Sequence, residues 1–240
     1  WTDALIYILI AIVTLLFFSL RGKQHFVRPW KKISHNRTAM VALVFLVFFL
    51  VIGLLDSIHF RPTNSQNNDI ISVLDYWVNP IRLKQEKSYS APFSANLYSK
   101  ELIMNSGQAP YWGYPRLEYG GRHLSDVQAQ KAGDILAKAT LGFLKGIAVI
   151  FILFYAYHLL WQRTFFSNKA VNTIFATLFF LVSSSYMLLE LTTYYHVMGT
   201  DKVGEDVFYQ TIKSIRTGLV IGSLTTLIML PLAIVFGILA

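Results

Sequence analysis

The sequence predicts an all-α, polytopic integral membrane protein with about five transmembrane helices and one large external loop. Three observations predict this fold class. Of the 240 residues, 54% are hydrophobic and only 14% are charged, whereas soluble domains usually carry about 25% charged residues. The apolar residues form separate long runs, and a backbone in hydrocarbon must satisfy its own hydrogen bonds, which favours helices. The excess basic residues lie in two short segments between these runs.

Five apolar runs are long enough to cross about 30 Å of hydrocarbon. They cover residues 4–20, 39–55, 139–161, 174–191 and 219–240. The last run contains Pro231. Proline is tolerated in a membrane helix when neighbouring groups satisfy the freed carbonyl, so we expect a kink and not a break. The first run has no charged segment before it and no small-residue cleavage site after it, so we interpret it as a retained helix and not as a signal peptide.

The positive charge predicts the orientation of the spans. Loop 21–38 holds six basic residues and loop 162–173 holds two, and neither contains an acid, so together they account for the net charge of +8. Lys and Arg are enriched in the cytoplasmic loops of membrane proteins. We therefore place these two loops in the cytoplasm and residues 56–138 and 192–218 outside. This explanation of the isoelectric point near 9.6 also argues against nucleic-acid binding.

The alternation divides the chain into four parts. Residues 1–55 form two transmembrane helices joined by a basic cytoplasmic loop, and residues 56–138 form an external loop domain. Residues 139–191 form a hairpin of two transmembrane helices. Residues 192–240 form an external elbow helix and the span that follows it.

Residues that could carry chemistry are sparse. The chain has no cysteine, and none of its six histidines has the i, i+4 partner of a helical zinc site. We interpret His158 as a polar residue at the membrane interface and the serines at 183–185 as helix-packing residues. The sequence therefore predicts no catalytic residues, no metal site and no cofactor bound by this chain. An enzyme is the least favoured class of function.

Two charged residues lie inside the predicted spans, where an ionisable group normally faces a partner or water. Lys145 lies about two turns into the third span, and Glu190 closes the fourth span at the same predicted face. Consecutive spans are antiparallel neighbours, which would allow an ion pair. The alternative is that each side chain extends separately to the interface.

The most specific pattern lies just before the last span. Gly199 and Gly204 bracket a predicted turn, and Asp201 or a neighbour suits the N-cap of a helix. Glu205 and Asp206 would then lie in the first helical turn, where the helix dipole favours acids. The pattern predicts an amphipathic elbow helix that begins at about residue 203.

This segment resembles the signature that precedes a core transmembrane helix in the dipeptide/oligopeptide/nickel class of permeases of binding-protein-dependent ABC transporters. That signature reads approximately His-x-Leu-Gly-Thr-Asp-x-x-Gly-Arg-Asp-Val-(Leu/Phe), then Gly-x-Arg, then Ser-Leu and a small residue. The matching positions are His196, Gly199, Thr200, Asp201, Gly204, Asp206, Val207, Phe208, Arg216, Leu219 and Gly222. The chain departs from it at Glu205, Ser214 and Gly218, which replace an arginine, a glycine and a serine. Residues 35–43 more loosely resemble the start of the first core helix.

The resemblance implies a permease subunit of an ABC importer for peptides or similar small solutes in a bacterial inner membrane. Such subunits pair with a second permease subunit, receive solute from an external solute-binding protein, and work with two cytoplasmic ATPase subunits that bind the ATP. No ATPase-docking segment of the Glu-Ala-Ala type occurs before Ala240, so we expect these residues to be the N-terminal portion of a longer subunit. The alternative function is a non-transporting membrane scaffold or sensor that uses the 56–138 loop.

Single-cysteine labelling tests the predicted orientation, because the chain has no cysteine of its own. We expect a Lys31→Cys variant to be protected from a membrane-impermeant thiol reagent in intact cells, and a Lys100→Cys variant to react. Labelling of the first variant as fast as the second would contradict the orientation.

Overall fold

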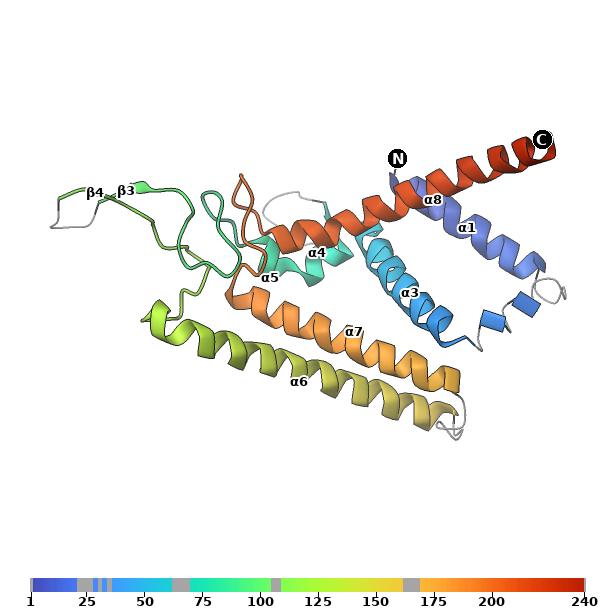
Figure 1. The fold of residues 1–240 in the computed structure, drawn as a ribbon, viewed down its shortest axis with the longest axis horizontal. Helices are drawn as coiled ribbons and strands as arrows, with labels where there is room; N and C mark the ends of the chain where they lie inside the picture. The colour runs from blue at the N-terminus through green and yellow to red at the C-terminus, as the bar shows by residue number, and fades with distance from the viewer. Residues whose placement is uncertain are drawn as a thin grey trace. The chain divides into compact units, whose positions relative to one another are not determined.

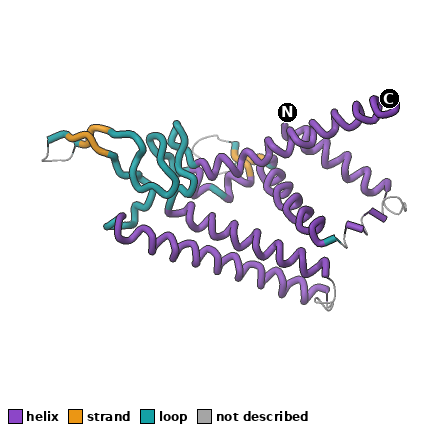
Figure 2. Tube along the Cα trace, viewed as in Figure 1, coloured by secondary structure: helices purple, strands orange, loops and turns teal. Residues whose placement is uncertain are grey.

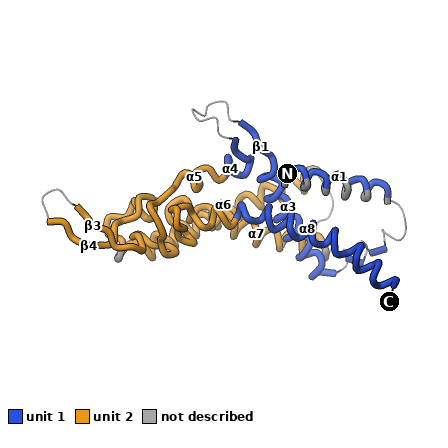
Figure 3. The backbone as a smooth tube through the Cα atoms, turned by 90° about the horizontal axis from the view of Figure 1, so that it is seen from above, with its two compact units in different colours: residues 1–77, 212–240 blue, residues 78–211 orange. Residues whose placement is uncertain are grey.

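The computed structural model describes residues 2–20, 28–29, 32–33, 36–61, 70–104, 109–161 and 169–239. The chain forms two compact units, one of residues 1–77 and 212–240 and the other of residues 78–211 (Figure 3). The described residues are mostly helical, and short strands occur only in the loops (Figure 2). The predicted helical fold class is therefore confirmed.

Four helices in the described part of the chain are long and apolar enough to cross a membrane. They are α3 (Arg37–Ser57), α6 (Val127–Trp161), α7 (Lys169–Tyr194) and α8 (Val207–Leu239) (Figure 1). The first predicted span forms α1 (Thr2–Leu20), which is not one of these four helices, so the number of five spans stays a prediction. Most of the two basic loops lies outside the described residues.

In the first unit, α3 has a capped N-terminus. The side-chain oxygen of Asn36 accepts hydrogen bonds from the backbone N–H groups of Thr38 (3.0 Å) and Ala39 (3.4 Å). These N–H groups have no partner within the helix, so the cap stabilises its first turn. After α3, the short strands β1 (His59–Phe60) and β2 (Ile71–Ser72) pair antiparallel and lead into α4 (Val73–Trp77).

A reciprocal cap fixes the start of α4. Ser72 Oγ accepts the backbone N–H of Asp75 (3.0 Å), and Asp75 Oδ2 accepts the backbone N–H of Ser72 (3.2 Å). This arrangement is a capping box. Ser72 Oγ also donates to Oδ1 of Asp56 near the end of α3 (2.9 Å), which ties α4 to α3.

The second unit contains α5 (Asn79–Arg82), a loop region, the α6–α7 hairpin and the first turn of α8. In the loop region, β3 (Glu101–Ile103) pairs antiparallel with β4 (Tyr111–Gly113). This strand pair lies beyond the N-terminal end of α6 (Figure 1). The loops enclose a small apolar core formed by Ile81, Leu97, Leu117, Leu124, Tyr195, Val197 and Phe208.

Within this unit, α6 and α7 pack side by side through glycine (Figure 1). A Cβ added at Gly142 would lie 2.7 Å from Cβ of Glu190 and 2.8 Å from Cα of Met187. A Cβ added at Gly146 would lie 2.6 Å from Cα of Ser183, a residue with no exposed surface. Small residues four positions apart are a common way for membrane helices to approach closely.

Two helix boundaries differ from the sequence-based expectations. Helix α6 begins at Val127, well before the apolar run, so the polar residues that precede the run belong to the same helix. The expected elbow helix and last span form one helix, α8, which begins at Val207 and passes through Pro231. The expected helix start near residue 203 was wrong, because Asp201 holds a turn there instead, as described below.

The glycine contact between α6 and α7 predicts an asymmetry between two glycines of one helix. We expect Gly146→Ala to lower the free energy of unfolding by roughly 1–3 kcal/mol, because the added methyl group would overlap the α7 backbone. Gly133→Ala is the matched control, since a Cβ at Gly133 meets no atom within 4 Å. That control should be neutral or stabilise by up to about 1 kcal/mol. Thermal unfolding in one detergent measures both variants, and equal effects would contradict the packing.

Candidate functional site

The segment between α7 and α8 folds into a tight turn that rests on residues 86–90. Gly199 and Gly204 have positive φ angles of 78° and 84°, a conformation that favours glycine. A Cβ at Gly199 would lie 2.2 Å from the carbonyl oxygen of Ser90, and one at Gly204 would lie 1.8 Å from the carbonyl oxygen of Glu86. Both positions require glycine because the two backbones touch.

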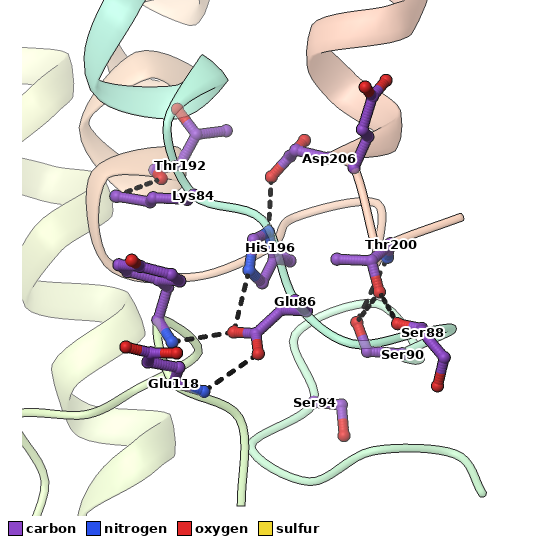
Figure 4. A network of polar contacts seen from close by, with 12 residues as sticks. Lys84, Glu86, Ser88, Ser90, Ser94, Glu118, Thr192, His196, Thr200 and Asp206 are labelled. Carbon is purple, nitrogen blue, oxygen red and sulfur yellow. Dashed lines mark hydrogen bonds and ion pairs between the residues drawn. The ribbon is translucent and has the colours of Figure 1, made fainter. Parts of the chain in front are cut away.

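Thr200 joins this turn to residues 86–90 through polar contacts (Figure 4). Its hydroxyl donates to the carbonyl oxygen of Ser88 (2.7 Å) and lies 3.1 Å from Oγ of Ser90. Its backbone N–H donates to the same Oγ of Ser90 at 3.1 Å. Thr200 is only 3% exposed, so these contacts are shielded from water.

Asp201 closes the turn and does not cap α8. Its Oδ1 accepts the backbone N–H groups of Val203 (3.0 Å) and Glu205 (2.9 Å), and its Oδ2 accepts the side-chain amide of Gln210 (2.7 Å). Burial alone would raise the pKa of Asp201, but these hydrogen bonds outweigh it and lower the pKa below 3.8. The N-cap role considered for Asp201 was therefore wrong, because its carboxylate is occupied before the helix begins.

Asp206 caps α8 and also contacts His196 (Figure 4). Its Oδ1 accepts the backbone N–H groups of Phe208 (2.8 Å) and Tyr209 (3.3 Å). Its Oδ2 lies 2.7 Å from Nδ1 of His196, and both side chains are 1% exposed. A single buried carboxylate thus holds the start of the helix and the histidine together.

Glu86 completes this buried cluster from the opposite side of the imidazole (Figure 4). Its Oε1 lies 3.4 Å from Nε2 of His196, and its side chain is 4% exposed. The same carboxylate accepts the backbone N–H groups of Tyr119 (2.7 Å) and Glu118 (3.0 Å). Sequence reasoning missed Glu86 because no motif surrounds it.

The cluster favours the charged form of the histidine. Burial alone would lower the pKa of His196, but its contacts with Asp206 and Glu86 outweigh burial and raise the pKa above 6.5. Burial alone would raise the pKa of Glu86, but His196 and the two backbone N–H groups lower it below 4.5. A cation between two buried carboxylates avoids the large cost of an unpaired buried charge.

Arg216, the remaining charged residue of the signature, belongs to the first unit. Its Nε lies 3.3 Å from Oδ2 of Asp56, and its guanidinium also donates to the carbonyl oxygen of Asp56 at 3.2 Å. One turn earlier, Lys213 Nζ lies 3.0 Å from the carboxylate of Asp75. Since Asp56 is 1% exposed and Asp75 6%, α8 supplies cations to two buried acids of α3 and α4.

The structure brings together the two charged residues of the predicted spans. Lys145 Nζ lies 2.7 Å from Oε2 of Glu190, so the two side chains form an ion pair between α6 and α7 and do not extend separately. The pair lies beside the Gly142 contact, because Gly142 packs against the Cβ of Glu190. The Lys145 side chain is 58% exposed, which makes this pair different from the buried His196 cluster.

The described residues contain no group of three or more His, Cys, Asp or Glu side chains with the arrangement of a metal site. The fold and these contacts define a helical, multi-pass membrane protein. Its loop unit, which consists of the loops between α5 and α6 and between α7 and α8, is fastened to the start of the long apolar helix α8. Comparisons with protein-family models, with curated proteins and with solved structures found no match.

The double role of Asp206 predicts a large effect of its removal. We expect Asp206→Ala to lower the free energy of unfolding by roughly 3–5 kcal/mol, because it leaves a buried cation without its closest partner and α8 without its cap. The control is Lys202→Ala, which changes an exposed side chain of the same turn and should alter stability by no more than about 0.5 kcal/mol. Chemical denaturation of both variants in detergent tests the prediction, and a small effect at Asp206 would contradict the role of the cluster.

Proposed function

We propose that the protein is a transmembrane permease subunit of an ABC importer for peptides or similar small solutes. The observation that carries this proposal is the burial pattern of the permease-like signature. Five matching positions of the turn are buried, namely His196, Gly199, Thr200, Gly204 and Asp206. The departing positions Glu205, Ser214 and Gly218 are exposed. Of the other matching positions, Phe208 is buried, Gly222 is exposed and the rest are partly exposed.

Within the turn, burial of these five matching positions is what a structural signature is expected to produce. Buried positions that set a backbone conformation or form a buried ion pair tolerate few residue types, whereas exposed positions tolerate many. Glu205 in place of the arginine of the signature therefore leaves the packed turn intact. The turn leads directly into α8, at the position where the resembling permeases have a core transmembrane helix.

The proposed role follows from how such importers work. The apolar spans would form part of the solute path together with a second permease subunit, and an external solute-binding protein would deliver the solute. Two cytoplasmic ATPase subunits would bind and hydrolyse the ATP. Transport paths are lined by a few polar or charged groups, and the sparse charges of the spans fit this expectation. The proposed location is a bacterial inner membrane, with the loop unit on the outer face.

One observation favours the alternative, a scaffold or sensor that does not transport. The hairpin of β3 and β4 and the loops beside it expose large apolar side chains, among them Tyr98 (76%), Met104 (75%) and Trp112 (71%). Exposed apolar surface of this kind suits contact with another protein. Such contact would require no ATPase.

Purification of the full-length protein from its native membranes separates the two functions. We expect two ATPase subunits and a second permease chain to co-purify in fixed proportion, and the purified assembly to hydrolyse ATP. We also expect deletion of the gene to abolish growth of an auxotrophic host on peptides that contain the required amino acid, while growth on the free amino acid is unchanged. Recovery of the protein without any ATPase, together with normal growth on peptides, would contradict the importer and favour the scaffold.

A further inference from the structure

Four ionisable side chains meet where the turn contacts residues 84–90. Two are the carboxylates of Glu86 and Asp206, and the third is His196 between them. The fourth is Lys84, whose charged form is favoured by Asp206 and whose Nζ donates to the carbonyl oxygen of Thr192 at the end of α7 (3.1 Å). With the histidine protonated, the two positive and two negative charges cancel. With the histidine neutral, a buried site is left with a net negative charge.

A neutral imidazole cannot donate an N–H to both carboxylates. It keeps one N–H, whereas the imidazolium donates from both ring nitrogens. Either Asp206, at 2.7 Å, or Glu86, at 3.4 Å, would then face a nitrogen lone pair. The shorter contact, with Asp206, favours keeping the remaining proton on Nδ1, so the loss falls on Glu86. Glu86 is the member of the cluster that lies in residues 86–90, so this loss weakens the contact between the turn and that segment.

We propose that His196 is a proton-dependent lock that fastens the 196–206 turn, and with it the N-cap of α8, to residues 86–90, and that loss of this proton releases the turn. This inference concerns the turn itself and does not depend on whether the protein transports a solute.

The direction of the pH dependence follows from the shifts of the groups involved. The pKa of His196 is raised above 6.5 in the folded protein, so the stability that it contributes is complete below 6.5 and is lost as the pH rises through the raised pKa. The pKa of Glu86 is lowered below 4.5, so its contribution is lost only as the pH falls through that lowered value. Burial lowers the pKa of Lys84, although Asp206 opposes this, so the second cation also weakens on the alkaline side.

Hydrogen exchange of the full-length protein in detergent, read by mass spectrometry, tests the lock. Protection factors for residues 84–91 and 196–206 would be measured from about pH 6 to about pH 10 and corrected for the intrinsic pH dependence of exchange. We expect protection of both segments to fall together by at least about tenfold across this range. The control is the α6–α7 contact around Gly146, where protection should be constant.

Two variants separate the lock from a general loss of stability. His196→Gln removes the imidazole, so protection of the two segments should be lower than in the wild type at about pH 6. The fall that begins near pH 6.5 in the wild type should be absent, and only the weakening of Lys84 should remain at the alkaline end of the range. Glu86→Gln leaves one carboxylate beside the histidine, so the loss of protection should occur at lower pH than in the wild type. If His196→Gln does not fold, the shift in the pH at which Glu86→Gln loses protection still tests the proposal. A constant protection in the wild type, or an unshifted midpoint in Glu86→Gln, would overturn the proposal.

Discussion

A histidine buried between two carboxylates is the interaction on which the rest of the loop unit depends. Removing one partner of a buried ion pair is strongly destabilising, because it leaves an uncompensated charge in a medium that solvates it poorly. The His196 cluster avoids this cost by drawing its partners from two segments that are far apart in the chain. Glu86 lies in the loop after α5, and Asp206 lies at the start of α8. The cluster therefore ties the loop after α5 to the start of α8.

The surrounding residues make this closure possible. Gly199 and Gly204 adopt left-handed backbone conformations and let the turn approach within contact of residues 86–90. The hydroxyl of Thr200 donates a hydrogen bond to the backbone of Ser88 across this contact. The carboxylate of Asp201 accepts a backbone hydrogen bond from Val203 within the turn and so stabilises its conformation. Because Asp206 belongs to both the cluster and the helix cap, the geometry of the turn also determines where α8 begins.

Four of the five predicted spans coincide with helices long and apolar enough to cross a membrane, whereas the loop contacts were not predicted, for a physical reason. A bilayer imposes long apolar runs, so most spans are visible without knowledge of tertiary contacts. The glycines of the turn were recognised as turn formers, but whether Asp201 or Asp206 caps the helix depends on which carboxylate the turn itself uses. The partners Glu86 and Ser90 carry no local signal, and Ser90 and Thr200 are 110 residues apart. Such pairings are set by tertiary packing. The capping box of Ser72 and Asp75, by contrast, is a local motif of residues three apart, although it was not singled out from the sequence.

The most direct test of this account is a disulfide between the turn and the loop that it rests on. Ser90 and Thr200 form an antiparallel bridge pair, and the Cα separation of such pairs, about 4.5–5.5 Å, lies within the range that a disulfide spans. The chain has no cysteine, so a Ser90→Cys, Thr200→Cys double variant carries only the two thiols of interest. Mild oxidation of membranes should form an intramolecular disulfide, seen as loss of both thiols to a maleimide probe with recovery on reduction. We expect nearly complete disulfide formation in the double variant and none in either single variant. Two thiols that stay free and react separately with the probe would contradict it.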